Sequence, residues 1–388
     1  MFEKRIFDVV LRRISRGGVA VRYWDGATHV YGPESPYFTL IVRAPSAVRG
    51  LLRNAALGLG EAYMDGRIEI DGPLSNVGRL VIENQAELEK LPFAQLAPRW
   101  RRTGRGSKKE HIQRHYDLGN DFYALWLDSS LTYSCAYFRD RDDSLETAQT
   151  QKIAYLLRKL RLREGQRMLD IGSGWGALMI TAAEVYGVQG LGVTLSEEQL
   201  SRSREAAKLA GVDDRVTFEL CDYRELAARG QKFDRVISVG MFEHVGRANH
   251  ERYYEAVAGM LNAGGVTVLH TITSEVEEPT DPWTDKYIFP GGYVPSTREI
   301  VTALPRHGLR LIDYENLRPH YAMTLEEWRR RYEAHRAEVI TMFDESFYRM
   351  WNLWLASSAA AFRYGAYNLS HFVLTKGVNN DLPFTQDA

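Results

Sequence analysis

Residues 168–176 read MLDIGSGWG, an apolar run that ends in an acidic residue and then breaks into three glycines at alternate positions. The apolar run predicts a buried strand, and the glycines predict a turn whose backbone a ligand can approach closely. A helix signal begins at Ala177, directly after this turn. Strand, glycine turn and helix in this order are typical of the first unit of an α/β sheet that binds its ligand at the carboxyl ends of the strands.

Strand and helix signals alternate from about residue 150 onward. The further strand segments are GLGVTL, RVTFEL, FDRVISVG and GGVTVLHTI, and helices are expected from Ala177, from Ser196 and over HERYYEAVAGML. This succession predicts a doubly wound, mostly parallel α/β sheet with helices on both faces. After it, residues 304–343 are expected to form a strand, a loop and a long helix, and residues 347–367 a second, apolar helix.

Composition divides the chain into three segments. Residues 1–95 join a short amphipathic helix signal to strand-like pieces around VAVRYWDG and TLIVRAP, which predicts a small α+β domain. Residues 96–114 are expected to be an exposed basic linker, because between Arg99 and Arg114 seven Lys and Arg residues face only one acidic residue, Glu110. Residues 115–388 are expected to hold the α/β domain.

Global properties exclude several classes of protein. The formal net charge is -1, which gives no reason to expect a nucleic-acid binder. Two cysteines need no disulfide framework, no signal peptide is apparent, and no apolar run reaches the roughly 18 residues of a membrane span. The chain is therefore expected to be cytoplasmic. A metal site is not expected, because none of the candidate ligands Cys135, Cys221, His244 and His270 belongs to a CxxC or HxxxH pair, and no G-x-S-x-G elbow supports a serine hydrolase.

The spacing of the glycines in this turn narrows the choice of ligand class. G-x-G-x-G differs from the G-x-G-x-x-G of a dinucleotide binder, and the second strand ends in Thr194, with Gln199 nearby, instead of in an acidic residue. Asp170 suits a ligand with an amino group, such as the methionine part of S-adenosylmethionine. The alternative is that Asp170 only caps the following helix.

Three further strand ends carry candidate functional residues. Asp222 and Tyr223 follow the third strand, where Asp222 would meet the base of a nucleoside, although Asp-Tyr is also an ordinary turn sequence. Glu243 and His244 follow the fourth strand, and His270 lies at the end of the next one. Acid and base candidates at adjacent strand ends, beside a cofactor turn, indicate a catalytic centre, although a single histidine is more often structural.

The segment HYDLGNDFYALWLDSSLTYSCAYF, residues 115–138, resembles the cyclopropane-fatty-acid synthases and their mycolic-acid relatives. The resemblance continues through LDIGSGWG, GVTLSEEQ, FDRVISVGMFEHVG, DPWTDKYIFPGG and the AAAFR tail. GLGEAYMDG is similar to the small leading domain of the full-length bacterial synthases. The resemblance implies the fold of a class I S-adenosylmethionine-dependent methyltransferase in residues 115–388. It also implies lipid binding or dimerisation through residues 1–95.

The activity that this resemblance implies is methylene transfer from S-adenosylmethionine to the cis double bond of an acyl chain in a membrane phospholipid, which forms a cyclopropane ring. Besides Asp170, which its place before the glycines suggests, the resemblance implies these cofactor contacts: Tyr133, Ser134, Gly172, Gly174, Thr194, Gln199, Asp222 and Tyr223. It also implies a bound bicarbonate that removes the proton from a carbocation intermediate. The ligands of this bicarbonate would be Cys135, Glu243, His270, the backbone amide of Ile272, and Tyr321. Ser358 stands where many members have a cysteine, so a cysteine nucleophile at that place is excluded.

A bilayer substrate requires contact with a membrane. The basic linker is expected to hold the protein reversibly on the inner face of the cell membrane. Three alternatives stay open from the sequence: a C-methyltransferase that leaves a methyl-branched or methylene lipid, an N-methyltransferase of a small amine, and a lipid-binding protein without activity. A homodimer is a further suggestion of the resemblance.

Overall fold

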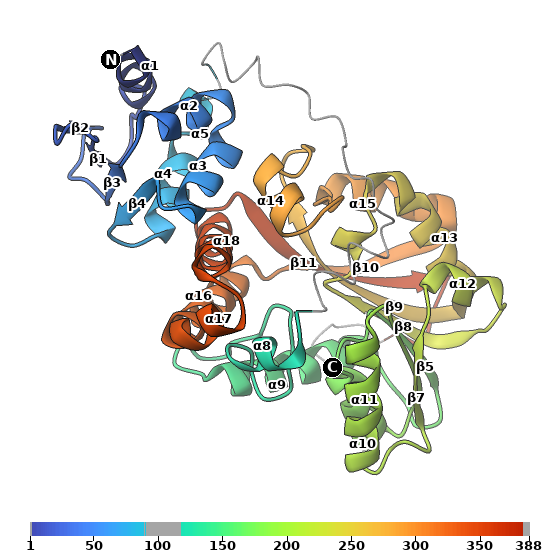
Figure 1. The fold of residues 1–388 in the computed structure, drawn as a ribbon. Coiled ribbons are helices and arrows are strands. Elements are labelled where there is room, and N and C mark those ends of the chain that lie inside the picture. Colours follow the sequence, from blue (N-terminus) through green and yellow to red (C-terminus); the bar gives the residue numbers. More distant parts are fainter. Residues whose placement is uncertain (1, 89, 91–117, 383–388) are drawn as a thin grey trace. The chain divides into compact units, whose positions relative to one another are not determined.

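The computed structural model describes residues 2–88, 90 and 118–382 (Figure 1). These residues form two compact units. One joins the described residues up to 90 with residues 280–290 and 325–366. The other holds the described residues within 118–279, 291–324 and 367–382. The basic linker expected at residues 96–114 lies outside the described part of the chain.

The first unit contains a four-stranded sheet with the strand order β2-β1-β3-β4. β1 pairs antiparallel with β2 and parallel with β3, and β3 pairs antiparallel with β4. This agrees with the expectation of a small α+β fold near the N-terminus. The elements are α1 (Phe2–Leu11), β1 (Val19–Arg22), β2 (Thr28–Tyr31), β3 (Thr39–Val42), α2 (Pro45–Arg53), α3 (Ala55–Met64), β4 (Ile68–Asp71), α4 (Ser75–Glu83) and α5 (Gln85–Leu88).

Helices from the C-terminal half of the sequence complete this unit. They are α14 (Pro282–Tyr287), most of α16 (Arg318–Ala334), α17 (Arg336–Met342) and α18 (Glu345–Arg363). The packing is close, because a Cβ on Gly60 would lie 2.2 Å from the Trp283 ring and one on Gly78 would lie 2.7 Å from Ala360 Cβ. Arg349 of α18 donates to Ile68 O at 3.0 Å. Packing, not chain continuity, thus groups these residues with the N-terminal ones.

The second unit is built on a seven-stranded sheet with the order β10-β11-β9-β8-β5-β6-β7. Strands β5 to β9 are parallel, and β11 is antiparallel to both β9 and β10. The strands are β5 (Arg167–Ile171), β6 (Gln189–Thr194), β7 (Val216–Leu220), β8 (Phe233–Val239), β9 (Leu261–Ser274), β10 (Leu309–Asn316) and β11 (Tyr367–Lys376). Because the chain passes from β5 to β6 on one side and later to β8 on the other, a ligand crevice is expected beyond β5 and β8.

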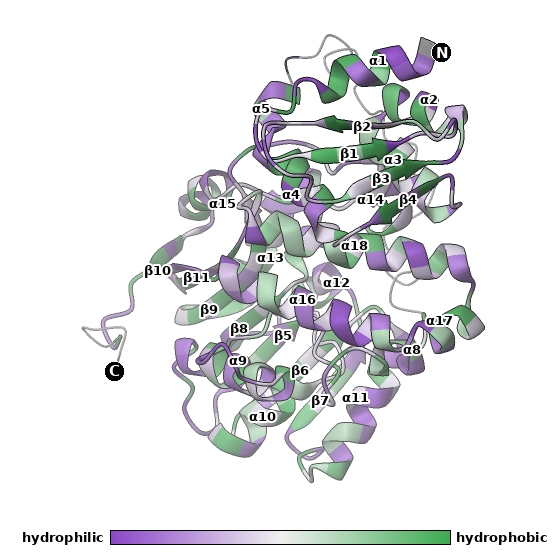
Figure 2. Ribbon diagram, turned by 90° about the vertical axis from the view of Figure 1, so that its left-hand side faces the viewer, coloured by the Kyte–Doolittle hydropathy of each residue, from purple (hydrophilic) through white to green (hydrophobic). Residues whose placement is uncertain are grey.

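Helices cover both faces of this sheet. One apolar cluster joins Met168 and Ile237 of the sheet to α9 (Leu145–Lys159), α10 (Ala177–Tyr186) and α11 (Glu197–Leu209). The other joins Leu169 and Val236 to α12 (Tyr223–Ala228), α13 (His250–Met260) and α15 (Thr297–Ala303). Neighbouring strand residues therefore face opposite cores, which explains the unbroken apolar runs of these strands. Figure 2 shows β8 and β9 largely in the colour of hydrophobic residues.

The doubly wound sheet expected from the sequence is confirmed, with helices where the signals at Ala177 and Ser196 placed them. The sequence did not indicate β11, since the expected apolar helix ran on to residue 367, whereas α18 ends at Arg363. Gly365, with φ 87°, lies between this helix and the strand. Within the described part of the chain, no helix combines the length and apolar character needed to cross a bilayer.

Candidate active site

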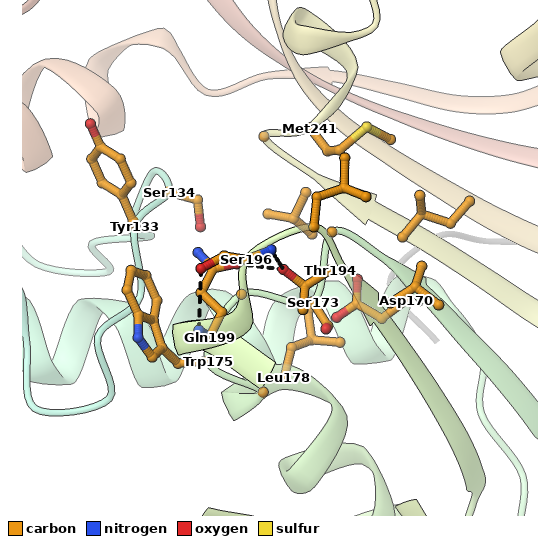
Figure 3. A pocket seen from close by; sticks show the side chains of 18 of the residues that line it. Tyr133, Ser134, Asp170, Ser173, Trp175, Leu178, Thr194, Ser196, Gln199 and Met241 are labelled. Carbon is orange, nitrogen blue, oxygen red and sulfur yellow. Dashed lines mark hydrogen bonds between the residues drawn. The ribbon is translucent and has the colours of Figure 1, made fainter. Parts of the chain in front are cut away.

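A cavity of about 170 Å³ lies at the carboxyl ends of β5 to β8, where the fold predicts a ligand (Figure 3). The turn after β5 forms part of its wall. Gly172, Gly174 and Gly176 in this turn have φ angles of 87°, 53° and 91°, which side chains other than glycine rarely adopt. A Cβ on Gly176 would lie only 2.7 Å from the Phe218 ring. The glycines therefore allow both the turn itself and the packing beneath it.

The residues predicted to contact the cofactor all line this one cavity. They are Tyr133, Ser134, Asp170, Gly172, Gly174, Thr194, Gln199, Asp222 and Tyr223. They come from three strand ends and from the segment that precedes α9, so the fold brings together residues that lie up to ninety positions apart. Their role in binding a cofactor stays a prediction.

Asp170, the last residue but one of β5, is buried at the base of the cavity. Its Oδ1 atom has no hydrogen-bond partner among the described residues, and burial raises its pKa to about 7. The N-cap of α10 is Gly176, and no side chain caps this helix. The alternative that Asp170 merely caps the helix is therefore wrong. A buried carboxyl oxygen without a partner suits a ligand that donates, such as an amino group.

The end of β6 is held by a short hydrogen-bonded chain, seen in Figure 3. Ser196 caps α11 by accepting from the backbone N–H of Gln199 at 3.3 Å, and its own N–H donates to Thr194 Oγ1 at 3.2 Å. The Thr194 hydroxyl donates to Gln199 Oε1 at 2.7 Å. These bonds fix both polar side chains at the cavity wall.

Asp222 is held in a turn and also lines the cavity. It caps α12 by accepting from the Arg224 N–H at 2.9 Å, and it pairs with the Arg224 guanidinium at 2.8 and 2.6 Å. It lines the cavity as well. Asp222 is thus a turn residue whose carboxylate is fixed beside Arg224, and its contact with a nucleoside base stays a prediction.

Sequence reasoning missed Lys152, which lines the cavity, and Gln149, which supports the cavity wall. Gln149 Nε2 donates to Ser134 O at 2.9 Å, and Lys152 Nζ donates to Ser134 Oγ at 2.8 Å, so α9 fixes the Ser134 segment. Lys152 lines the cavity, and burial lowers its pKa to about 8. The sequence could have indicated both residues by their helical spacing, because they lie on the stripe of buried residues of α9 that also contains Leu145, Ile153 and Leu156.

None of the predicted catalytic residues lines this cavity; Glu243 follows β8, while His270 and Ile272 lie within β9, which continues to Ser274. Glu243 Oε1 accepts from the Ile272 N–H at 2.6 Å, while Oε2 is shielded from water and has no partner in the described residues. Burial raises the pKa of Glu243. His270 lies beside the end of β8, since its carbonyl accepts from Gly240 N at 2.9 Å, and Gly240 and Met241 line the cavity. The short loop after β8 therefore contributes Gly240 and Met241 to the cavity wall and also carries Glu243.

Cys135 and Tyr321 belong to two segments that are hydrogen-bonded to each other. Ala136 N donates to Thr324 Oγ1 at 3.0 Å, and Phe138 N donates to His320 Nδ1 at 3.1 Å. Cys135 is buried directly after Ser134, and burial raises the pKa of its thiol, which therefore stays protonated. Ser358 lies in α18, in the other unit.

Residues 104–372 match the family described as mycolic acid cyclopropane synthetase, and residues 6–90 match a domain of unknown function. A probable fatty acid methyltransferase of Pseudomonas putida is 37% identical over 95% of either chain. A cyclopropane-fatty-acyl-phospholipid synthase of Escherichia coli strain K12 is 39% identical over 88% of either chain.

Among solved structures, the mycolic acid cyclopropane synthase CmaA1 complexed with SAH and CTAB is similar, with a TM-score of 0.64 and 33% identity. The comparison covers 69% of this chain and 98% of that one. These matches agree with the resemblance read from the motifs, and they place the glycine turn and its cavity in a methyltransferase fold. The chain therefore belongs to the cyclopropane synthase family of S-adenosylmethionine-dependent methyltransferases.

Proposed function

We propose that this enzyme transfers a methylene group from S-adenosylmethionine to the cis double bond of an acyl chain in a membrane phospholipid, and closes a cyclopropane ring. The Escherichia coli relative, which carries that activity in its name, supports the substrate class. The observation that carries ring closure is Glu243, whose shielded Oε2 atom lies on the loop that adjoins the cavity. Methyl transfer to an alkene needs no base, but ring closure does.

Different cavity residues bind different parts of S-adenosylmethionine, the methyl donor. Asp170 accepts from the amino group of the methionine part, and the bare backbone of Gly172 and Gly174 allows its close approach. Thr194 and Gln199 hold the ribose hydroxyls, and Asp222 accepts from the adenine amino group. Bound in this way, S-adenosylmethionine supplies an electron-poor methyl group, and its reaction with an alkene depends mainly on alignment.

The predicted bicarbonate site fits the side chains that are present. Glu243 has one unpartnered oxygen, and its raised pKa favours the protonated acid, which can donate a hydrogen bond to an anion. His270 is neutral because burial lowers its pKa, so it adds no competing charge. Cys135, Tyr321 and the Ile272 amide are the other groups proposed to hold the ion. When bound, bicarbonate supplies a small base.

Purified enzyme mixed with S-adenosylmethionine and vesicles of an unsaturated phospholipid tests this function. We expect the lipid to gain one CH2, to lose its olefinic protons and to show cyclopropane protons in the NMR spectrum. Vesicles of a saturated phospholipid of equal chain length are the control, and they should remain unchanged. Conversion of neither lipid would reject the proposal.

A second candidate product is a methyl-branched or methylene lipid. The Pseudomonas putida relative, which is similar over nearly its whole length, is named a probable fatty acid methyltransferase. The same NMR spectrum separates the two products, because exomethylene or branched-methyl signals would replace the ring protons. Cyclopropane protons alone would exclude this candidate.

A further inference from the structure

Two buried histidines on neighbouring strands are hydrogen-bonded to each other in the second unit. His270 of β9 and His371 of β11 are register partners, and His270 Nδ1 lies 2.8 Å from His371 Nε2. The two side chains are 1% and 0% exposed. The ring centroids lie 4.8 Å apart. No part of the activity proposed above uses His371.

Both imidazoles are neutral in this environment. Burial lowers the pKa of each histidine well below the ordinary value, and the ammonium groups of Lys152 and Lys159 act in the same direction. His320 adds to the effect at His371. A neutral imidazole carries one N–H, so exactly one of the two histidines donates the bond that joins them.

The second ring nitrogen of His371 decides the direction of this bond. His371 Nδ1 is shielded from water and has no hydrogen-bond partner among the residues that the structure describes. If His371 carried its proton there, a buried N–H would be left unpaired, which proteins rarely tolerate. With the proton on Nε2, only a lone pair is left unpaired, and Nε2–H donates to His270 Nδ1.

We propose that His371 is a positioning residue, which donates from Nε2 to His270 Nδ1 and thereby keeps the single proton of His270 on Nε2. The inference rests on the proposed function, in which His270 helps to hold a small oxyanion. In this tautomer His270 offers a donor at Nε2, which suits an anion, and it has no lone pair left to act as the base. His270 then orients the proton acceptor and does not compete with it.

NMR of the full-length protein labelled with 15N-histidine tests the tautomer without cofactor or lipid. We expect one histidine whose Nδ1 is an unprotonated hydrogen-bond acceptor and whose Nε2 is protonated, paired with a second histidine of the same tautomer. Spectra of the His371→Gln variant assign both signals. A protonated Nδ1 on His270 would overturn the proposal, whatever lipid the enzyme makes, so this result is independent of the proposed function.

Kinetics of three variants test the role. His371→Gln keeps an N–H donor, so its kcat should stay close to that of the unsubstituted enzyme. His371→Leu should lower kcat about 10- to 100-fold, the size of effect seen when the outer partner of a metal-ligating histidine is lost, while the KM for S-adenosylmethionine is unchanged. Thr375→Val removes another buried hydrogen bond of β11, to Gly377 O, and is the control for stability alone. Equal kcat values for the Gln and Leu variants would contradict the role.

Discussion

At Asp170, burial and ligand binding favour opposite forms of one carboxyl group. Burial favours the protonated form, and a cationic ligand favours the ionised form. The folded pKa of Asp170, about 7, lies above the ordinary 3.8, so its contribution to stability is fully present at low pH and is lost as pH rises through 7. A cationic amino group requires the ionised carboxylate, so cofactor affinity should rise over the same interval. Before its ligand arrives, the site therefore holds a carboxyl group that the folded protein disfavours in its ionised form.

Asp170→Asn separates these two effects. We expect about 10- to 100-fold weaker S-adenosylmethionine binding at pH 8, because one charge-assisted hydrogen bond is lost. The ligand-free variant should melt at a higher temperature than the unsubstituted protein at pH 8, and by a smaller margin at pH 5, because the cost of ionising Asp170 develops as pH rises from 3.8 to about 7. Calorimetric titration and thermal unfolding at both pH values measure this. An unchanged affinity would remove Asp170 from the cofactor site.

Glu243→Gln tests the acid beyond the cavity. The amide retains the acceptor for the Ile272 N–H but replaces the acidic O–H that is proposed to hold bicarbonate by a weaker donor, so turnover should be largely abolished. Because Glu243 does not line the cavity, the affinity for S-adenosylmethionine should stay within a few fold. Isothermal titration and a lipid assay on the same preparation make the comparison. Loss of cofactor binding together with turnover would place Glu243 in a different role.

At the residue scale, strand ends were predictable and supporting residues were not. The cofactor candidates gathered in one cavity because the carboxyl ends of parallel strands always meet at the same edge of a sheet. Lys152 and His371 escaped notice because a lysine in a helix is usually exposed, and because β11 itself was not predicted. Their positions depend on partners far away in the sequence.

At the scale of the element, the turn between β5 and α10 depends on glycine, because a larger side chain would strain the backbone or collide with a neighbouring side chain. Gly176→Ala should lower the free energy of unfolding by about 1–2 kcal/mol for its left-handed backbone and by about a further 1–3 kcal/mol for the clash with Phe218. Gly174→Ala is the matched control, with φ 53° and nothing within 4 Å of the added Cβ, and should show only the first cost. Urea unfolding measures both, and equal losses would contradict this explanation.

The strands from β5 to β9 were predictable because their apolar runs are buried on both faces and are bounded by turns. β11 was not, because YNLSHFVLTK mixes polar and apolar residues and follows an apolar helix without a proline. Its polar residues His371 and Ser370 are buried with hydrogen-bond partners on β9. Such pairing across strands leaves no local signal.

At the scale of the whole molecule, composition indicated an N-terminal fold but not its full content. Residues 325–366 join that unit through contacts such as that between Gly78 and Ala360, which no periodicity reveals. A unit assembled from distant segments is recognised only when its packing is known. That residues 1–95 make membrane or dimer contacts while residues 115–388 carry out the chemistry stays a prediction.

Membrane attraction through residues 96–114 is a prediction for the intact protein. Each Lys or Arg near an anionic surface contributes about 1 kcal/mol, so sedimentation with anionic vesicles should be strong at low salt and weak at high salt. Replacing Arg105, Lys108 and Lys109 by Gln should weaken it at low salt. Vesicles of neutral lipid are the control. Vesicle binding that does not change with salt concentration would exclude an electrostatic attachment.

The most direct measurement uses S-adenosylmethionine with a trideuterated methyl group, purified enzyme and unsaturated phospholipid vesicles. Ring closure removes one proton from the transferred carbon, so the account predicts a cyclopropane lipid that keeps two of the three deuterium atoms. A product that keeps all three in a branched methyl group, or a lipid without deuterium, would contradict it.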